Sequence, residues 1–268
     1  MDMKNISAEL LQKIRKNAPL VHNITNYVVM NSSANILLAL GASPVMAHSR
    51  REVEEMAAIA GALVLNIGTL SAQWVDAMLL AAKSANQRGI PVILDPVGAG
   101  ATTYRSQAVQ AILSETTVSV IRGNASEVLS LAVADVKTKG VDSSIAVSGE
   151  MVEAVGAIAR QHGCIVAVSG ETDLITDGSR VIRVQNGHPL MGYVTGTGCT
   201  ATVTIGAFLA VDDDPVTAAA TALAYFGLAG EVAGQNAAAP GSFMIQMLDA
   251  LYTITPEALE AGCKIEAS

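Results

Sequence analysis

The stretch ALVLNIGTLSAQWVDAMLLAAKSANQRGIPVILD, residues 62–95, sets the fold class of this chain. It opens with an apolar run over 62–67, which predicts a buried strand. Residues 72–87 then read as a helix, closed by Gly89. A second strand is predicted over 91–95. Strand, helix and strand in this order predict a right-handed crossover between two parallel strands.

The same alternation continues toward the C-terminus. Helices are predicted at 107–113 and 151–162, and strands at 118–122 and 164–169. Because the strand runs do not alternate between apolar and polar residues, we expect both faces of the sheet to be covered.

The pattern changes after Gly170. Residues 173–184 predict a hairpin with its turn at Asp177-Gly178, and from Thr200 onward the chain predicts almost only helix. No linker, repeat or low-complexity segment interrupts it. We therefore expect one α/β domain over residues 1–268, with three layers (α/β/α) around a mostly parallel sheet.

The composition argues against several functional classes. The chain has 268 residues, a formal net charge of −8, 51% hydrophobic residues and 15% charged residues. Disordered chains show the opposite balance, and an acidic chain is not expected to bind nucleic acid. Three widely spaced cysteines, Cys164, Cys199 and Cys263, indicate neither a disulfide framework nor a zinc site.

The low charge raises the possibility of a membrane protein. The cleanest apolar stretches, 199–211 and 215–230, each fall short of the roughly 18 continuous apolar residues of a membrane span. Residues 212–215 separate them, so we expect two buried helices joined by a capped turn. Residues 1–16 read as a short amphipathic helix without the apolar core of a signal peptide. The expectation is a cytoplasmic protein that does not contact a membrane.

Two predicted strands end in segments that could carry chemistry. Asp95 opens the Gly-rich turn DPVGAG, which taken alone is more typical of a tight turn. Arg122 follows the next strand, where a guanidinium needs an anionic partner such as a phosphate. Asn124 and Glu127 form an N-x-x-E pattern. This either aims a carboxylate at the crevice or makes a helix capping box, and both interpretations stay open.

The segment VTGTGCTA, residues 194–201, is the most informative single element. Gly196 and Gly198 free the backbone, and a long helix is predicted to begin at Cys199 or Thr200. The N–H groups at such a helix start would bind the anionic phosphoryl group in transit. The segment lacks the G-K-[ST] ending of a Walker A loop and the third glycine of a dinucleotide fingerprint.

Taken together, these elements resemble the ribokinase-like small-molecule kinases. Finer matches resemble the hydroxyethylthiazole kinase family of thiamine salvage. They span most of the chain and lie at 21–26 (VHNITN), 38–46 (LALGASPVM), 65–69 (LNIGT), 95–101 (DPVGAGA), 121–124 (IRGN) and 241–243 (GSF).

The resemblance implies ATP-dependent phosphorylation of the hydroxyl of 4-methyl-5-(2-hydroxyethyl)thiazole, in a homotrimer with sites shared between subunits. It also implies a set of site residues. These are Asn26, Met46 and the Gly196 backbone for the thiazole, Arg122 and Ser169 for the ATP phosphates, Asp95 and Glu127 for Mg²⁺, and Gly196 and Gly198 with the following helix for the moving phosphoryl group. Two alternatives remain: a kinase of a pyrimidine or pyridoxal-like alcohol, and a nucleotide-dependent hydro-lyase of the same fold.

Cys199 stands where most ribokinase-like kinases carry an aspartate, although a cysteine is usual in the thiazole-kinase family. An ordinary thiol is mostly protonated at pH 7, but a helix N-terminus can lower its pKa. Phosphoryl transfer depends mainly on positioning and electrostatics, so a strong base is dispensable. We therefore expect Cys199 either to orient the alcohol or to accept its proton late.

Overall fold

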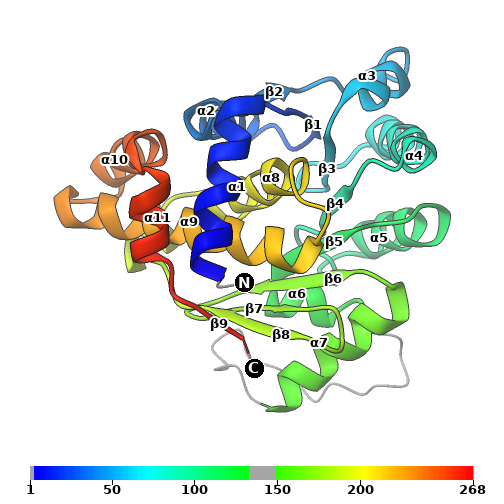
Figure 1. Cartoon of the computed structure of the whole chain (residues 1–268). Helices are drawn as coiled ribbons and strands as arrows, with labels where there is room; N and C mark the ends of the chain where they lie inside the picture. The colour runs from blue at the N-terminus through cyan, green and yellow to red at the C-terminus, as the bar shows by residue number, and fades with distance from the viewer. Residues whose placement is uncertain (1–2, 133–148, 268) are drawn as a thin grey trace.

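The computed structural model describes residues 3–132 and 149–267 of the chain. A single mixed β-sheet runs through this part (Figure 1). Its strands are β1 (Leu20–Ile24), β2 (Ser43–Val45), β3 (Ala62–Asn66), β4 (Val92–Asp95), β5 (Val120–Asn124), β6 (Ile165–Ser169), β7 (Asp173–Thr176), β8 (Val181–Val184) and β9 (Ile265–Ala267).

The strand order is β2-β1-β3-β4-β5-β6-β7-β8-β9. Strands β1 to β6 pair in parallel, and β6 to β9 pair antiparallel. From β1 the chain moves outward to β2 and then returns to β3 on the other side. The gap between β1 and β3 is therefore a topological switch point, which is where open α/β sheets bind ligands.

Helices cover both faces of the sheet, as Figure 1 shows. One face carries α3 (Val53–Ile59), α4 (Ala72–Arg88), α5 (Thr103–Glu115), α6 (Ala125–Leu129) and α7 (Gly149–His162). The other carries α1 (Met3–Asn17), α2 (Met30–Leu40), α8 (Thr197–Leu209), α9 (Pro215–Asn236), α10 (Pro240–Thr253) and α11 (Pro256–Gly262). The short 3-10 helix η1 (Pro189–Tyr193) leads into α8. The predicted three-layer, mostly parallel architecture is confirmed.

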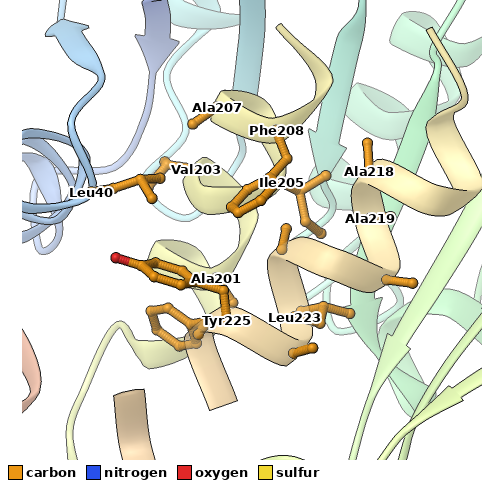
Figure 2. Close-up of a cluster of buried hydrophobic side chains, with 14 of the residues drawn as sticks. Leu40, Ala201, Val203, Ile205, Ala207, Phe208, Ala218, Ala219, Leu223 and Tyr225 are labelled. Atoms are coloured by element: carbon orange, nitrogen blue, oxygen red, sulfur yellow. The ribbon is translucent and has the colours of Figure 1, made fainter. Parts of the chain in front are cut away.

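The larger core lies between α8, α9 and the sheet. Figure 2 shows alanines of the two helices set among larger side chains such as Phe208 and Tyr225. At Gly206 a Cβ would lie 2.8 Å from Val64 Cγ2 on β3, closer than atoms can pack. Glycine at that position therefore lets α8 rest directly on the sheet, with the helix N-terminus over the sheet's carboxyl edge.

In the described part of the chain, one helix is long and apolar enough to cross a membrane, judged by length and composition alone. It is α9, and 78% of its most apolar window is buried inside the fold. Its first turn is capped by Asp214, whose side chain accepts the N–H of Val216. The expected pair of buried helices joined by a capped turn is therefore confirmed.

The expected helices and strands are present, with two kinds of difference: shifted helix starts and strands that were not predicted. Helix α8 begins at Thr197 rather than at Cys199 or Thr200, and α5 begins at Thr103 rather than at 107. Strands β1, β2 and β9 were not predicted. Polar residues interrupt β1, and the other two strands have only three residues each, too few for a periodic signal.

Candidate active site

The carboxyl ends of the parallel strands gather several predicted site residues beneath the N-terminus of α8. Asn26 follows β1, Asp95 ends β4, Arg122 lies in β5 and Cys199 lies in the first turn of α8. Asn26, Asp95 and Arg122 are buried, and Cys199 is partly buried. Buried polar groups persist only where they are paired or serve a ligand, so this cluster is the candidate site.

Asp95 lies at the base of the cluster. Its Oδ2 accepts hydrogen bonds from Asn66 Nδ2 and Thr202 Oγ1, both at 2.8 Å. Burial raises the pKa of Asp95 to about 6, although the positive charge of Arg122 and these hydrogen bonds oppose the shift. The carboxylate is therefore mostly ionised at neutral pH and is held in a fixed orientation.

A chain of amides leads from Asp95 to Cys199. Asn66 Oδ1 accepts from Asn26 Nδ2 at 2.8 Å, and Asn26 Nδ2 also approaches Cys199 Sγ at 3.6 Å. Asn66 had no predicted role. The available signal was a polar residue ending an otherwise apolar strand, immediately before the Gly68-Thr69 turn.

Burial raises the pKa of Cys199 to about 11, and the negative charge of Asp95 acts in the same direction. Hydrogen bonds from Asn66 and Asn26 act in the opposite direction but do not overcome burial. The thiol is therefore protonated at neutral pH, because burial outweighs the groups that favour the thiolate.

Asn124 and Glu127 were expected either to form a helix capping box or to direct a carboxylate at the crevice. The capping box is formed: Asn124 Oδ1 accepts the Glu127 N–H and Glu127 Oε2 accepts the Asn124 N–H, both at 2.9 Å. Glu127 Oε1 also accepts the N–H of Gly98 at 2.8 Å. The carboxylate thus ties the turn after β4 to the start of α6, which brings it beside the Asp95 turn.

Arg122 is the buried cation of the site. Its side chain is 7% exposed, and its Nε has no hydrogen-bond partner among the described residues. It lines a cleft of about 710 Å³ together with Ser169, Gly198 and half-buried Asp173. The unpaired Nε–H fits the prediction that this guanidinium serves an anionic ligand.

The first turn of α8 opens into the same cleft. Gly196 has φ 82°, and a Cβ there would lie 2.4 Å from Val29 Cγ1, so only glycine fits this N-cap position. The first bond of the α-helical pattern runs from the Thr200 N–H to the Gly196 carbonyl. The N–H groups of Gly198 and Cys199 therefore lack helical acceptors and can bind an anion.

The structure places the remaining predicted residues at the borders of the site. Ser169 ends β6, lines the cleft and donates to the Gly123 carbonyl at 3.4 Å. Met46 follows the edge strand β2 and is partly buried. Its contact with the thiazole stays a prediction.

Arg105 is a further residue that the sequence did not single out. Its guanidinium donates to the carbonyls of Ile67, Gly68 and Val97. These hydrogen bonds fasten the turn after β3 to the turn after β4. The relative position of Asn66 and Asp95 is thus braced from outside the cluster.

A mostly parallel sheet with a buried arginine, a buried aspartate and an open glycine-rich helix start at one edge defines a ribokinase-like small-molecule kinase. Solved structures support this class at the level of the fold. A ribokinase-like superfamily protein from Enterococcus faecalis superimposes with a TM-score of 0.66 at 14% identity, covering 93% of this chain and 95% of the other. A pyridoxal kinase from Staphylococcus aureus, solved with pyridoxal, has a TM-score of 0.65 at 16% identity and covers 93% and 97%.

Closer relatives define the family. A sequence profile of the hydroxyethylthiazole kinase family matches residues 11–257. The chain is 60% identical over 269 residues to a hydroxyethylthiazole kinase of Desulfotalea psychrophila, covering 99% of this chain and 98% of the relative. A hydroxyethylthiazole kinase from Pyrococcus horikoshii superimposes with a TM-score of 0.90 at 43% identity, covering 98% and 99%. This chain belongs to the hydroxyethylthiazole kinase family, which confirms the predicted resemblance.

Proposed function

We propose that this enzyme transfers a phosphoryl group from ATP to the hydroxyl of 4-methyl-5-(2-hydroxyethyl)thiazole, giving the thiazole phosphate and ADP for thiamine synthesis. Membership of the hydroxyethylthiazole kinase family supports the substrate. The observation that carries the chemistry is the buried Arg122, whose Nε has no hydrogen-bond partner among the described residues and which lines one cleft with the open first turn of α8. An anionic phosphoryl group fits between a buried cation and free helix N–H groups.

The cleft is lined by groups of two kinds. We place the ATP phosphates at Arg122, Ser169 and Gly198, which offer a cation, a hydroxyl and a helix N–H. Apolar side chains, including Met191, Leu223 and Phe226, line the same cleft. A base and its ribose fit such an apolar surface. We therefore place the adenine between η1 and α9, the late helical region whose pocket residues no sequence motif identifies.

Asp95 and Glu127 are the proposed Mg²⁺ residues. Mg²⁺ prefers oxygen ligands, retains several waters, and commonly binds one or two carboxylates plus substrate phosphates. The donor set fits that mode, because Asp95 and Glu127 are two carboxylates at the turn after β4: Asp95 precedes the turn, and Glu127 accepts the Gly98 N–H within it. The oxygens of Glu127 already accept backbone N–H groups, so it fits binding through water. When bound, Mg²⁺ would neutralise negative charge on the ATP phosphates.

Cys199 and Asn26 would hold the acceptor alcohol. Because the pKa of Cys199 is about 11, its thiol is protonated at neutral pH and fits a role in orienting the hydroxyl. The amide of Asn26 is already hydrogen-bonded: its Nδ2 contacts Asn66 and Cys199, and its Oδ1 accepts the Val28 N–H. Its contribution to thiazole binding would therefore come mainly through Cys199. The moving phosphoryl group would be stabilised by the first-turn N–H groups of α8.

A homotrimer with shared sites remains part of the proposal. Tyr27, Val28 and Leu38 are large apolar residues exposed beside the segment that carries Asn26. Met46 lies on the same side of the sheet, after the edge strand β2. A neighbouring subunit on this surface would cover the apolar side chains and complete the thiazole pocket. We likewise propose that the chain works as one domain in the cytoplasm.

A coupled ADP-release assay tests the function. It compares the thiazole alcohol with pyrimidine and pyridoxal alcohols, each with and without Mg²⁺. We expect turnover that requires both the thiazole alcohol and Mg²⁺. Preference for another alcohol would favour a different kinase of this fold, and ATP use independent of any alcohol would favour the hydro-lyase alternative.

A further inference from the structure

Asn66 is a buried amide at the carboxyl end of β3 to which the proposed chemistry gives no role. It is the Cα partner of Asp95 in the parallel pairing of β3 and β4. Its side chain is 2% exposed. Burying an amide costs free energy unless its polar atoms are paired. The side chains that pair with it, Asn26 and Asp95, belong to the proposed active site.

Backbone donors fix the orientation of this amide. The Gly68 N–H donates to Asn66 Oδ1 at 2.9 Å, and because an N–H can only donate, the facing atom must be oxygen. The Val28 N–H fixes Asn26 Oδ1 in the same way, at 3.0 Å. Asn26 Nδ2 therefore donates to Asn66 Oδ1, and Asn66 Nδ2 donates to Asp95 Oδ2.

Asn66 thus joins two halves of the site. On one side Asn26 Nδ2 approaches Cys199 Sγ at 3.6 Å, where the acceptor alcohol is proposed to bind. On the other side lies Asp95, which accepts a hydrogen bond from Thr202 of α8. Metal and phosphate are proposed to bind beside Asp95. An in-line transfer requires the alcohol oxygen and the phosphorus to be correctly placed relative to each other.

The packing limits other positions of the pair. A Cβ at Gly68 would lie 2.6 Å from Asn26 Nδ2, so Asn26 is already in close contact with the turn. Asn26 is 4% exposed, and its Nδ2 donates to Asn66 Oδ1 at 2.8 Å. Its position therefore depends in part on the oxygen that Asn66 offers.

We propose that Asn66 is a positioning residue for phosphoryl transfer, holding the alcohol side at Asn26 and Cys199 in register with the metal and phosphate side at Asp95. The inference rests on the function proposed above and deepens it. Asn66 acts through the side chains that it touches, Asn26, Asp95 and Cys199, contacts neither reactant and moves no proton. Its removal disturbs the geometry of the reacting groups and leaves the ATP cleft intact, because Asn66 does not line that cleft.

Steady-state kinetics of Asn66→Ala test the proposal. We expect kcat to fall roughly 100-fold, the size of effect that a misplacement of about 1 Å produces. The KM for ATP is expected to stay within about threefold of wild type. Asn23→Ala is the matched control: Asn23 is 1% exposed on β1, and among the described residues its Nδ2 donates to the Val21 carbonyl of its own strand alone, at 2.8 Å. Its kcat should stay within about threefold.

A double-mutant cycle with Asn26→Ala adds a readout that a general loss of stability would not produce. Because Asn66 acts partly through Asn26, the double variant should lose clearly less kcat than the product of the two single losses. Multiplicative losses, a kcat of Asn66→Ala within threefold of wild type, or an equal loss in Asn23→Ala would each overturn the proposal.

Two further comparisons make the result unambiguous. If Asn66→Ala does not fold, Asn66→Ser is judged by the same criteria, and failure of both to fold would assign Asn66 to stability alone and reject the inference. Wild-type turnover of the thiazole alcohol is measured first. Its absence would refute the proposed function, whereas normal turnover with an unaffected Asn66→Ala would refute only the positioning role.

Discussion

Gly198→Ala tests whether the first turn of α8 and Arg122 act on the same ligand. A Cβ at this position would lie 2.7 Å from Arg122 Nη1 and 3.5 Å from both Cζ and Nη2. Such a contact is too short by roughly 1 Å for packed atoms. The guanidinium is the end of a long side chain, so it should move in preference to the helix backbone.

The expected loss follows from the hydrogen bonds that Arg122 would make. A hydrogen bond to a charged group contributes about 1.5–3 kcal/mol. Displacing the guanidinium from one such bond to phosphate therefore costs roughly 10- to 150-fold in kcat/KM for ATP. Stability should change by no more than about 1 kcal/mol, because alanine favours the helix over glycine by a similar amount.

Kinetics with varied ATP, combined with urea unfolding, separate the two effects. Gly241→Ala is the matched control, because Gly241 also lies in the first turn of a helix and a Cβ there meets no atom within 4 Å. The control should keep its kcat/KM, and its stability should also change by no more than about 1 kcal/mol. The reasoning is refuted if kcat/KM of Gly198→Ala for ATP stays within threefold of wild type, or if Gly241→Ala loses as much kcat/KM as Gly198→Ala.

Four further outcomes are expected. Arg122→Ala should lower kcat/KM for ATP at least tenfold more than Lys83→Ala, which removes only an exposed ion pair; equal losses would contradict phosphate binding at Arg122. Cys199→Ala should lower kcat without changing the dependence of kcat on pH between pH 7 and 9, because a thiol with a pKa of about 11 does not ionise there. If wild-type kcat rises with pH in this range and the kcat of the variant does not, Cys199 acts as a thiolate base. Asp95 has a folded pKa of about 6, above its unfolded value near 4, so its ionisation opposes folding. In Mg²⁺-free urea titrations, wild-type stability relative to Asp95→Asn should fall as pH rises from about 4 to about 6 and then level off; a constant difference would reject the shift. Ala18→Gly should raise the free energy of unfolding by about 0.5–1 kcal/mol, because Ala18 immediately follows α1 and has a φ of 43°; unchanged thermal unfolding would argue against strain there.

The elements that were predicted correctly share one property. Residues 62–66 and 92–95 are apolar runs bounded by turn residues, and burial on both faces makes such runs easy to read. Strand β1 instead contains His22 and Asn23, both buried, so its composition does not indicate a strand. Its place in the sheet is fixed by pairing with β2 and β3. A local sequence pattern carries no information about such pairing.

The proposed site also contains features that the sequence predicts and features that it leaves open. Asp95 and Arg122 follow apolar strands, and parallel strands bring their carboxyl ends to one edge, so the sequence alone predicts that these residues meet. The sequence left two interpretations of Asn124 and Glu127 open, and the structure forms the capping box. That choice depends on backbone angles at the helix start, which residue types favour but do not fix.

The sequence by itself determined the fold class, the family and the edge of the sheet where the chemistry is placed, because these depend on local runs and on residues spaced along the chain. Only the tertiary structure decided that Asn66 links Asn26 to Asp95, that burial raises the pKa of Cys199, and that Gly198 packs against Arg122. Each of these depends on atoms from different elements. Their distances and burial are set when α8 packs onto the sheet, and no local pattern records them.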